Sequence, residues 1–548
     1  MSDGKKRMVR AFAFGAGLAL VVWGVRATGA WAQQASPTPA AAEPVATAAP
    51  PAAPVPAPAA APEPKGPDPT GATTGTAADV PVKDAANPTL TEVMETVGHN
   101  KISINFVWLL LTGFLVMFMQ TGFAMVETGF TRAKNAAHTF SMNYMVYPIG
   151  MFGYWVCGFA MQMGGVGAVA ALGGTPPLTG MFSIELFGKT FELMGTKGFF
   201  LGGDVYDVGV FALFLFQMVF MDTAVTIPTG AMAERWKWSS FLVFGLFMSM
   251  FVYPLYGNWV WGGGWLADLG VNFGLGHGHV DFAGSSVVHM VGGWAALAGA
   301  IVIGPRIGKY KDGKPVAIPG HHIPMALVGT LILAFGWFGF NPGSTFAGTD
   351  LRIAVVATNT MLAGTGGALT SMIYMMWRYG KPDPSMMANG MLAGLVAITA
   401  PCAFVTAPVS MLIGAISGVL VCVAVFFVEA TLKVDDPVGA FSVHGVNGLW
   451  GVIALGLFAD GKYGDGWNGV PGTVKGLFYG DGSQLGAQCV GALTCIVFVF
   501  VSFYIFFKVV DKIIGNRVSA EVELEGLDLP EMGALAYPEF SKSTSAGS

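Results

Sequence analysis

DFAGSSVVHMVGG at residues 281–293 and DPVGAFSVHGVNG at residues 436–448 share the pattern D-x-x-G-x-x-x-V-H-x-V-x-G. We count eleven long apolar runs in the chain, and these stretches open the fifth and the tenth. A motif that returns five spans later enters the membrane from the opposite face, which is typical of inverted repeats with a substrate site near the midplane. The pair therefore predicts an all-α polytopic membrane protein with a five-plus-five inverted repeat.

The composition rules out most soluble classes. Hydrophobic residues make up 53% of the 548 residues and charged residues only 11%, whereas a soluble domain carries about 25% charged residues. The net charge of −5 offers no basic surface for a nucleic acid. The five cysteines lie in apolar runs without a C-x-x-C spacing, so we expect neither a disulfide framework nor a zinc site. These counts exclude a soluble enzyme, a disordered protein and a nucleic-acid binder.

The apolar runs are long enough to cross a membrane. A helix needs about 20 residues to span the hydrocarbon core, and only the eighth run is marginal in length. The runs are 102–128, 138–163, 207–231, 239–262, 282–304, 322–346, 352–378, 386–402, 405–432, 438–458 and 484–514. We therefore expect eleven transmembrane helices.

Positive charges sort the loops between the runs. Lys and Arg gather in one alternating set of loops, which the positive-inside rule assigns to the cytoplasm. These residues are Arg132, Lys134, Arg235, Lys237, Arg306, Lys309, Lys311, Lys314, Arg378, Lys381, Lys433, Lys508, Lys512 and Arg517. The rule predicts a cytoplasmic C-terminus and a processed N-terminus outside.

The N-terminus has the parts of a secretory signal peptide. A basic segment and a short apolar run precede the small-x-small site A-W-A at residues 30–32. We expect cleavage of residues 1–32, with an uncleaved first span as the alternative. Residues 33–100 then form a periplasmic linker, because positions 35–64 hold 13 Ala and 10 Pro and cannot build a core. Such an exported chain is most simply bacterial, and its membrane is then the cytoplasmic (inner) membrane.

Two histidines lie at matching distances from opposite faces of the predicted membrane. His289 and His444 each stand eight residues after the acid of their motif, about 12 Å in from opposite faces of a core about 30 Å thick. They are expected to meet near the middle, where an ionisable group is costly and usually functional. Satisfied core residues and axial ligands of a haem iron are the alternatives. Four others fall in predicted loops and are expected to be solvated: His277, His279, His321 and His322.

Aromatic side chains converge at the predicted outer mouth. Helical spacing puts Trp337, Phe340 and Ser344 on one face of the sixth run, with the serine nearest the outside. The same spacing pairs Phe216 with Phe220 on the third run, and a tryptophan ends the fourth. Aromatic faces and a hydroxyl suit a small cation, although an interfacial aromatic belt gives the same pattern.

Seven stretches carry a resemblance that covers about residues 101–530. They are ETGFTRAKN (127–135), FQMVFMDTAVTIPTGAMAERWKW (216–238), VWGGGWL (260–266), DFAGSSVVHMVGG (281–293), GWFGFNPGS (336–344), AGLVAITAPCA (393–403) and VDDPVGAFSVHGVNGLWG (434–451). Together they resemble ammonium transporters of the Amt/MEP/Rh superfamily, on the Amt side. The resemblance implies a homotrimer of eleven-helix protomers, each with its own narrow pore.

The resemblance also implies a role for each matching residue. By this resemblance, Phe216, Trp261 and Ser344 correspond to the outer ammonium recruitment site, and Phe220 and Phe340 correspond to the stacked phenyl gate. Trp337 and Thr399 correspond to the pore wall, and His289 and His444 correspond to the twin-histidine pair. Asp281 resembles the acid that organises the outer mouth without touching the substrate. The order Ala400-Pro401 departs from the pattern expected after Thr399.

These residue types fit ammonium uptake. NH4+ is strongly hydrated and costly to move through a dry pore, whereas neutral NH3 passes an apolar channel cheaply. A neutral imidazole pair can bond NH3 and relay a proton separately, and K+, which must cross as an ion, is rejected. Electrogenic NH4+ transport and NH3 conduction are both compatible with this expectation, which needs no enzymatic step, cofactor or metal. An ammonium sensor and a redox protein with a bis-histidine cofactor remain as alternatives.

The last segment, residues 516–548, is an acidic cytoplasmic tail. Its composition alone predicts a solvated tail. The stretch EGLDLPEMGALAY at residues 525–537 is similar to the family's regulatory tail, which packs under neighbouring protomers and couples to a PII-type signalling protein. The transporter domain then covers residues 101–515. Asp222, two residues beyond the predicted gate on the third run, stays open between a structural and a functional role.

Overall fold

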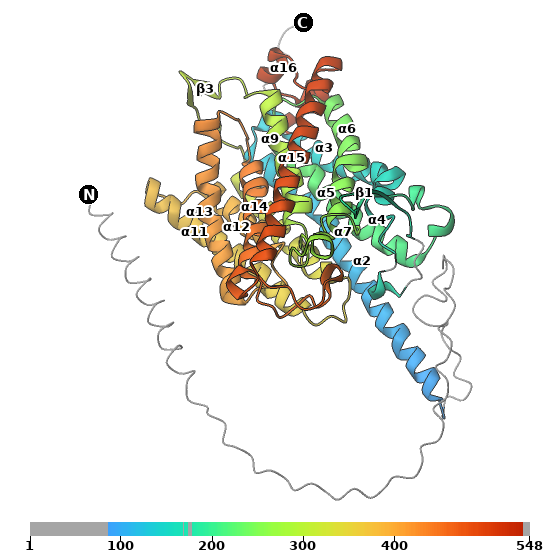
Figure 1. Ribbon diagram of the computed structural model, residues 1–548. Helices are drawn as coiled ribbons and strands as arrows, with labels where there is room; N and C mark the ends of the chain where they lie inside the picture. Colours follow the sequence, from blue (N-terminus) through green and yellow to red (C-terminus); the bar gives the residue numbers. More distant parts are fainter. Residues whose placement is uncertain (1–85, 168, 174–177, 541–548) are drawn as a thin grey trace, which may run out of the picture. The chain divides into compact units, whose positions relative to one another are not determined.

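The computed structural model describes residues 86–167, 169–173 and 178–540 (Figure 1). The predicted signal peptide, residues 1–32, lies outside the described residues, as does the predicted linker up to residue 85. The chain divides into two units, and the larger one, Gly66–Met376 with Lys381–Ser548, contains the helix bundle. Of the smaller unit, the structure describes only Trp377–Gly380.

Within the described residues, nine helices are long and apolar enough to cross a membrane. Four are unbroken: α2 (Leu90–Phe130), α5 (Val208–Ala231), α11 (Ile353–Tyr379) and α15 (Gly482–Ile513). Five include a π or 3-10 turn: α6 (Trp238–Phe247) with α7 (Tyr253–Trp261), η7 (Ser285–Met290) with α9 (Val291–Ile303), α10 (Ile323–Phe340), α13 (Ala407–Phe427), and η10 (Phe441–Val446) with α14 (Asn447–Phe458). The predicted all-α membrane architecture is confirmed.

The two remaining predicted runs are helical as well. α3 (Ala136–Gly153) continues through a π turn into α4 (Phe159–Met163), and α12 (Pro384–Ile398) is a shorter apolar helix. Every predicted run thus corresponds to a helix, and the count of eleven membrane crossings stays a prediction.

The first helix starts earlier than its apolar run. α2 begins at Leu90, inside the predicted linker, because Thr89 and Glu92 form a capping box that satisfies the free N–H groups of its first turn. The helix thus begins upstream of residue 101, where the transporter domain is predicted to start, and becomes apolar near that residue.

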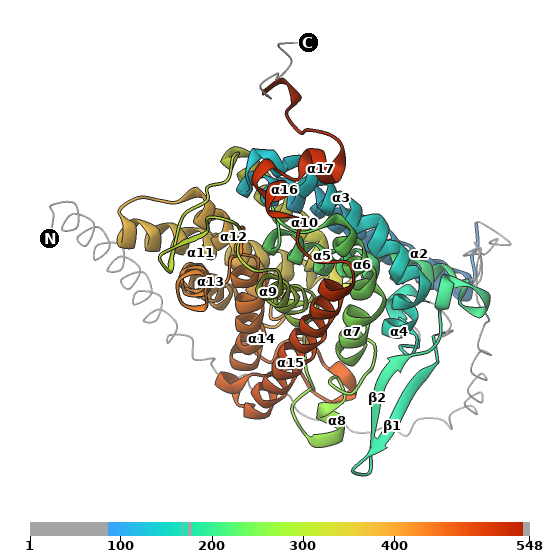
Figure 2. The same cartoon turned by 90° about the horizontal axis from the view of Figure 1, so that it is seen from above.

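Glycines let the helices approach closely. A Cβ on Gly122 of α2 would lie 2.8 Å from Cγ of Leu333 on α10, and one on Gly329 of α10 would lie 2.7 Å from the Gly122 carbonyl oxygen. Small residues at such contacts are typical of membrane bundles, in which close backbone packing drives association. Figure 2 shows α9 inside the bundle, beside α5 and α15.

The two matching motifs form half-helices that cross in opposite directions. η7 and η10 are six-residue π turns that lead into α9 and α14. A Cβ on Gly293 would lie 2.2 Å from the Gly445 backbone nitrogen, and one on Gly448 would lie 2.5 Å from the Ser285 carbonyl oxygen. Later residues of one motif thus meet earlier residues of the other, so the antiparallel crossing expected from the shared pattern is present.

A β-hairpin that the apolar pattern does not indicate lies between α4 and α5. β1 (Met181–Leu186) pairs antiparallel with β2 (Lys189–Gly195), and Figure 2 shows the hairpin extending outward from the bundle. Trp265 donates its backbone N–H, and Trp259 its indole N–H, to carbonyl oxygens of β2. The hairpin is therefore fastened to the segment that follows α7.

The acidic tail folds against its own chain. α16 (Ala520–Glu525) and α17 (Asp528–Met532) lie at the end of the bundle that also carries β3 (Tyr310–Lys311) and β4 (Lys314–Pro315) (Figure 1). Glu523 pairs with Arg517 at 2.7 Å, and Asp528 accepts a 2.9 Å hydrogen bond from the backbone of His138. Both acids are 1% exposed. The expectation of a merely solvated tail, drawn from composition, is wrong for these residues.

Candidate functional site

A pocket of about 160 Å³ opens beside the start of η7. Phe216, Trp261 and Ser344, the three residues predicted for the outer site, all line it. The Ser344 hydroxyl donates to the Phe340 carbonyl oxygen at 2.7 Å, so its own oxygen remains available to accept a hydrogen bond. Phe346, which sequence reasoning missed, also lines the pocket and meets Phe216 edge-on, with ring centroids 5.3 Å apart.

One carboxylate binds the backbone beside this pocket. Asp281 is 1% exposed and accepts hydrogen bonds of 2.7–3.0 Å from four successive backbone N–H groups, those of residues 284–287, and from the Ser286 hydroxyl. Its own carbonyl oxygen accepts the indole N–H of Trp261 at 2.7 Å. Asp281 therefore fixes the first turn of η7 and one wall of the pocket together.

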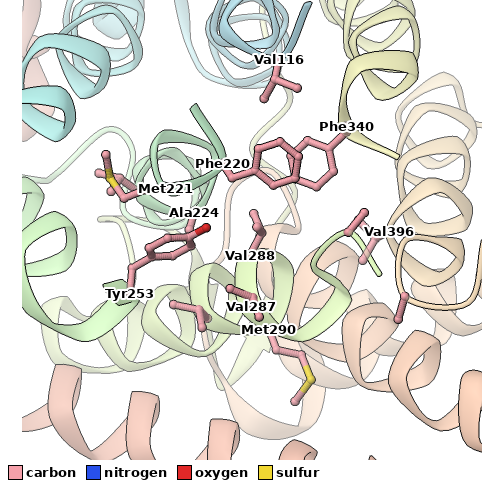
Figure 3. Packing of buried hydrophobic residues seen from close by; sticks show 14 of the residues in the cluster. Val116, Phe220, Met221, Ala224, Tyr253, Val287, Val288, Met290, Phe340 and Val396 are labelled. Atoms are coloured by element: carbon pink, nitrogen blue, oxygen red, sulfur yellow. The ribbon is translucent and has the colours of Figure 1, made fainter. Parts of the chain in front are cut away.

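A pair of phenyl rings closes the floor of the pocket. Phe220 of α5 and Phe340 of α10 stack with centroids 4.2 Å apart and an interplanar angle of 20°. Both are at most 1% exposed. In Figure 3 the two rings overlap, with Val116 and Val288 close to them. Because the two rings are in contact, a solute can pass between them only if a ring moves.

The two motif histidines meet directly below this pair. His289 stacks on Phe340 with centroids 5.4 Å apart, and its Nδ1 lies 3.2 Å from Nδ1 of His444. One neutral tautomer donates and the other accepts, so the pair shares a single N–H···N hydrogen bond without carrying charge. The crossing of the half-helices has thus brought the histidines together, as their matched depth predicted.

The same distance argues against iron between the rings. Two trans imidazoles on one metal place their nitrogens about 4 Å apart, twice a metal–nitrogen bond of about 2 Å. The pair at 3.2 Å is a hydrogen-bonded one, and the described residues hold no cluster of three metal-binding side chains.

Trp337 and Thr399 form a unit behind the histidines. Trp337 stacks against His289 at 5.4 Å, and its indole N–H donates to the Thr399 hydroxyl at 3.0 Å. Thr399 in turn donates to the Leu395 carbonyl oxygen at 2.7 Å. The Thr399 hydroxyl thus spends its one proton on its own helix and accepts the indole N–H, which leaves one acceptor lone pair for a solute.

A second pocket, of about 260 Å³, lies on the side that is predicted to face the cytoplasm and is called the inner pocket. Asp436 and Ser442, from the motif that carries His444, line it together with Arg306. Arg306 pairs with the buried Asp435 at 2.8 Å. Burial opposes ionisation of Asp435, but the charges of Arg235 and Arg306 outweigh it and lower the pKa of that carboxyl.

Two histidines expected to be solvated are buried instead. His277 is 6% exposed and His279 is fully buried, with its Nε2 2.9 Å from the Ser286 hydroxyl. Burial lowers the pKa of His279 to about 4, so it is neutral. The loop that carries both is held by Gln484 and Gln488 of α15, which bond its backbone. Two glutamines one turn apart on the last apolar run are a sequence signal for this contact.

The sequence of the chain that builds this column was compared with models of protein families. A model of the Ammonium Transporter Family matches residues 107–537. The chain belongs to the ammonium transporter family. With its apolar helices it is a multi-pass membrane protein of a transport family, not an enzyme.

Relatives in the family match over most of their length. Ammonium transporter Amt2 of Archaeoglobus fulgidus is 45% identical over 450 residues, which cover 81% of this chain and 91% of the relative. Ammonium transporter Amt1 of Haloferax mediterranei is 37% identical over 454 residues, 80% of each chain.

Solved structures agree with the fold. A structure described as a sensor Amt protein has 34% identity and a TM-score of 0.67, and it is covered over 99% of its length by 79% of this chain. Mep2 of Candida albicans has 26% identity and a TM-score of 0.65, with 81% of this chain covering 92% of it.

Proposed function

We propose that this family member takes up ammonium across a bacterial cytoplasmic membrane, through one pore in each protomer. The observation that carries the proposal is the continuous column from the outer pocket through Phe220 and Phe340 to His289 and His444. Along this column, aromatic faces, a hydroxyl oxygen and imidazole nitrogens in turn replace interactions that water makes with ammonium or ammonia.

Recruitment takes place in the outer pocket. Phe216 and Trp261 offer aromatic faces and Ser344 offers an oxygen, so the three replace part of the hydration shell of NH4+. The carboxylate of Asp281 is spent on the backbone of η7, so it positions the mouth and does not bind the ion. Phe346 is added to this site as an edge-on support of Phe216.

Passage favours the neutral molecule. The Phe220–Phe340 gate and the apolar wall below it make an ion costly, whereas NH3 loses few hydrogen bonds. The His289–His444 pair can bond NH3 and relay the proton that NH4+ leaves at the mouth. Trp337, held by Thr399, keeps the His289 ring in place. K+ has no proton to lose and is rejected.

We infer further that the protein is a homotrimer with a PII-type protein as partner of its C-terminal tail. The positive-inside rule supports a cytoplasmic tail and a processed N-terminus outside. Cleavage at the A-W-A site would start the mature chain at Gln33, and the intact mass of the membrane-extracted protein tests this.

Ammonium sensing is a second candidate function. It is favoured by the 34% identity to a structure described as a sensor Amt protein, which this chain covers over 99% of its length. The bis-histidine redox alternative is disfavoured by the 3.2 Å separation of the ring nitrogens. An absorption spectrum of the purified protein tests it.

The deciding experiment is a current measurement on proteoliposomes adsorbed to a solid-supported membrane. An ammonium jump should evoke a transient current if the proton crosses with the substrate, or a rise of internal pH without current if NH3 alone passes. A K+ jump should evoke neither. If the purified protein gives no ammonium response of either kind, the proposed uptake is wrong, and sensing becomes the better account.

A further inference from the structure

A second pair of stretches follows the symmetry of the histidine motifs. Residues 120–127 of α2 read QTGFAMVE, and residues 337–344, from α10 to the outer mouth, read WFGFNPGS. Both contain Gly-Phe at the same positions, and both end on a polar residue four positions after the phenylalanine. Residues four apart lie on one face of a helix. Glu127 therefore occupies on α2 the position that Ser344 occupies after α10.

The contacts of the two phenylalanines match this correspondence. Phe340 packs on His289 with centroids 5.4 Å apart, and Phe123 packs on His444 with centroids 6.1 Å apart. From each histidine the polar residue lies one turn beyond its phenylalanine, toward the outside for Ser344 and toward the inside for Glu127. Glu127 is thus the inner counterpart of a recruitment residue.

Glu127 stands next to the inner pocket. Its Cδ lies 3.1 Å from the Cβ position of Gly230, and Cγ2 of Val438 lies 2.5 Å from the same point. Val438 lines the inner pocket. Asp436, in the same loop, is the titratable group whose charge acts on Glu127. The carboxyl of Glu127 therefore lies near Val438, which is part of the pocket wall.

The cage around Glu127 accepts the carboxyl with or without a proton. Glu127 is 3% exposed, and Asn143 Nδ2 donates to it at 2.7 Å. The Thr229 hydroxyl lies 2.8–2.9 Å from both carboxyl oxygens and 2.5 Å from the Thr226 carbonyl oxygen. Thr229 has one proton for these acceptors. It donates to an ionised Glu127, or it donates to Thr226 and accepts from a protonated one.

A polar side chain also lies one turn before Phe123 on α2. Both amide atoms of Gln120 are buried and have no partner among the described residues, and Gln120 shares a helix face with Phe123 and Glu127. Buried amides that lack a protein partner usually bind water. Water at Gln120 gives a proton a route past the apolar Phe123 ring.

From this geometry we propose that Glu127 is the proton-exchange group of the inner half of the pore. The inference rests on the proposed function. An N–H bond of a protonated His444 ring breaks as an O–H bond forms on water beside Phe123, and that water passes a proton to the Glu127 carboxylate. The carboxylic acid then gives its proton to NH3 in the inner pocket, which becomes NH4+, and the carboxylate is restored.

The test is Glu127→Gln in the full chain, reconstituted in proteoliposomes. Glutamine donates to Thr229 and accepts from Asn143 as a protonated glutamate does, but it exchanges no proton. We expect the ammonium-evoked current to fall at least tenfold while NH3 entry, read as a rise of internal pH with an encapsulated dye, persists. Glu127→Asp should restore part of the current.

The matched control is Asp222→Asn. Asp222 is another buried carboxyl of a spanning helix, 2% exposed, and neither of its oxygens has a hydrogen-bond partner among the described residues. It lies against Gly150 of α3. We expect this variant to keep the wild-type current.

The remaining outcomes distinguish a failure of the Glu127 role from a failure of ammonium uptake itself. A wild-type current in Glu127→Gln, or a parallel loss of current and NH3 entry in both variants, overturns the role of Glu127. Wild-type protein that conducts NH3 without any current overturns it too and leaves ammonium uptake standing. Wild-type protein with neither response overturns uptake and the inference together.

Discussion

Among single residues, Asp281 is the one whose hydrogen bonds hold the proposed outer mouth together. The first turn of a helix leaves backbone N–H groups without partners, and Asp281 accepts those of residues 284–287 at the start of η7. His289 stands later in the same π turn, so its position in the column follows from that cap.

We predict that Asp281→Ala loses most ammonium uptake, at least tenfold. Alanine leaves four buried N–H groups without an acceptor, which costs about 3 kcal/mol or more by the usual values for caps and charged hydrogen bonds. Uptake and the melting temperature of the reconstituted protein measure the two effects. Asp481→Ala is the control, because Asp481 caps α15 through residues 483 and 484, away from the column. Uptake by a normally expressed Asp281→Ala protein at the wild-type rate would contradict this role.

The predicted aromatic site residues were accessible to sequence reasoning because they lie on regular helices. The spacing of Phe216 and Phe220, and of Trp337, Phe340 and Ser344, survives in the structure as shared faces. Phe346 was missed since it follows the end of α10 with a left-handed φ of 56°, where helical periodicity no longer applies. The contacts of Glu127 and Thr399 depend on side chains from other helices, which no local pattern reports.

Among the elements, the crossing of α9 with η10 sets the distance between the histidines. The two backbones touch because Gly293 and Gly445 carry no side chains; a Cβ on Gly293 would lie 2.2 Å from a backbone nitrogen. The repeated motif indicated this crossing. The hairpin of β1 and β2 was not foreseen, because its strands are stabilised by tryptophans from a distant segment.

Gly293→Ala should separate the half-helices and break the histidine hydrogen bond. We predict a lower melting temperature and a loss of at least tenfold in ammonium transport. The matched variant is Gly486→Ala in α15, whose Cβ would meet Leu275 at an ordinary 3.6 Å. That change should be neutral or slightly stabilising, since alanine is favoured over glycine in a helix by about 1 kcal/mol. Equal behaviour of the two variants would show that the close crossing is dispensable.

The outer loop before α8 (Leu269–Phe273) should give a pH-dependent stability. Burial, and then the charge of Glu192, raise the pKa of Asp268 to about 6. Since the unfolded value is about 3.9, the contribution of Asp268 to stability is full below about pH 4 and is lost as the pH rises through about 6. Asp268→Asn should therefore raise the melting temperature by about 1–2 °C at pH 8 and not at pH 4. Asp312→Asn, in an exposed turn, is the control, and an equal rise at both pH values would refute the assignment.

On the scale of the whole molecule, buried acidic side chains of the tail bind it to the inner loops. Glu523 pairs with Arg517 and accepts the backbone N–H of Ile307, which directly follows Arg306 of the Arg306–Asp435 pair at the inner pocket. A partner that displaces the tail would therefore act on the loops that surround the pore exit. Neither the burial of these acids nor their partners follows from the composition of an acidic tail.

Deleting residues 521–548 should leave the pore folded and weaken regulation. We predict wild-type ammonium current with loss of PII binding in a pull-down. Arg517→Ala, which removes the ion pair to Glu523 and keeps the tail, should weaken binding less than the deletion does. Unchanged PII capture by the truncated protein would remove the tail from the proposed partner site.

The central claim is that a neutral histidine pair makes the pore selective, and His289→Asp and His444→Asp test it most directly. An aspartate places an anion in the narrow segment below the phenyl gate, where it attracts cations and water. Ammonium and K+ uptake and current are measured in the same vesicles, with alanine variants at both positions to separate loss of the proton relay from loss of selectivity. We predict that the aspartate variants admit K+ or lose their preference for ammonium, while the alanine variants still exclude K+. Aspartate variants that exclude K+ and carry a normal ammonium current would contradict the claim.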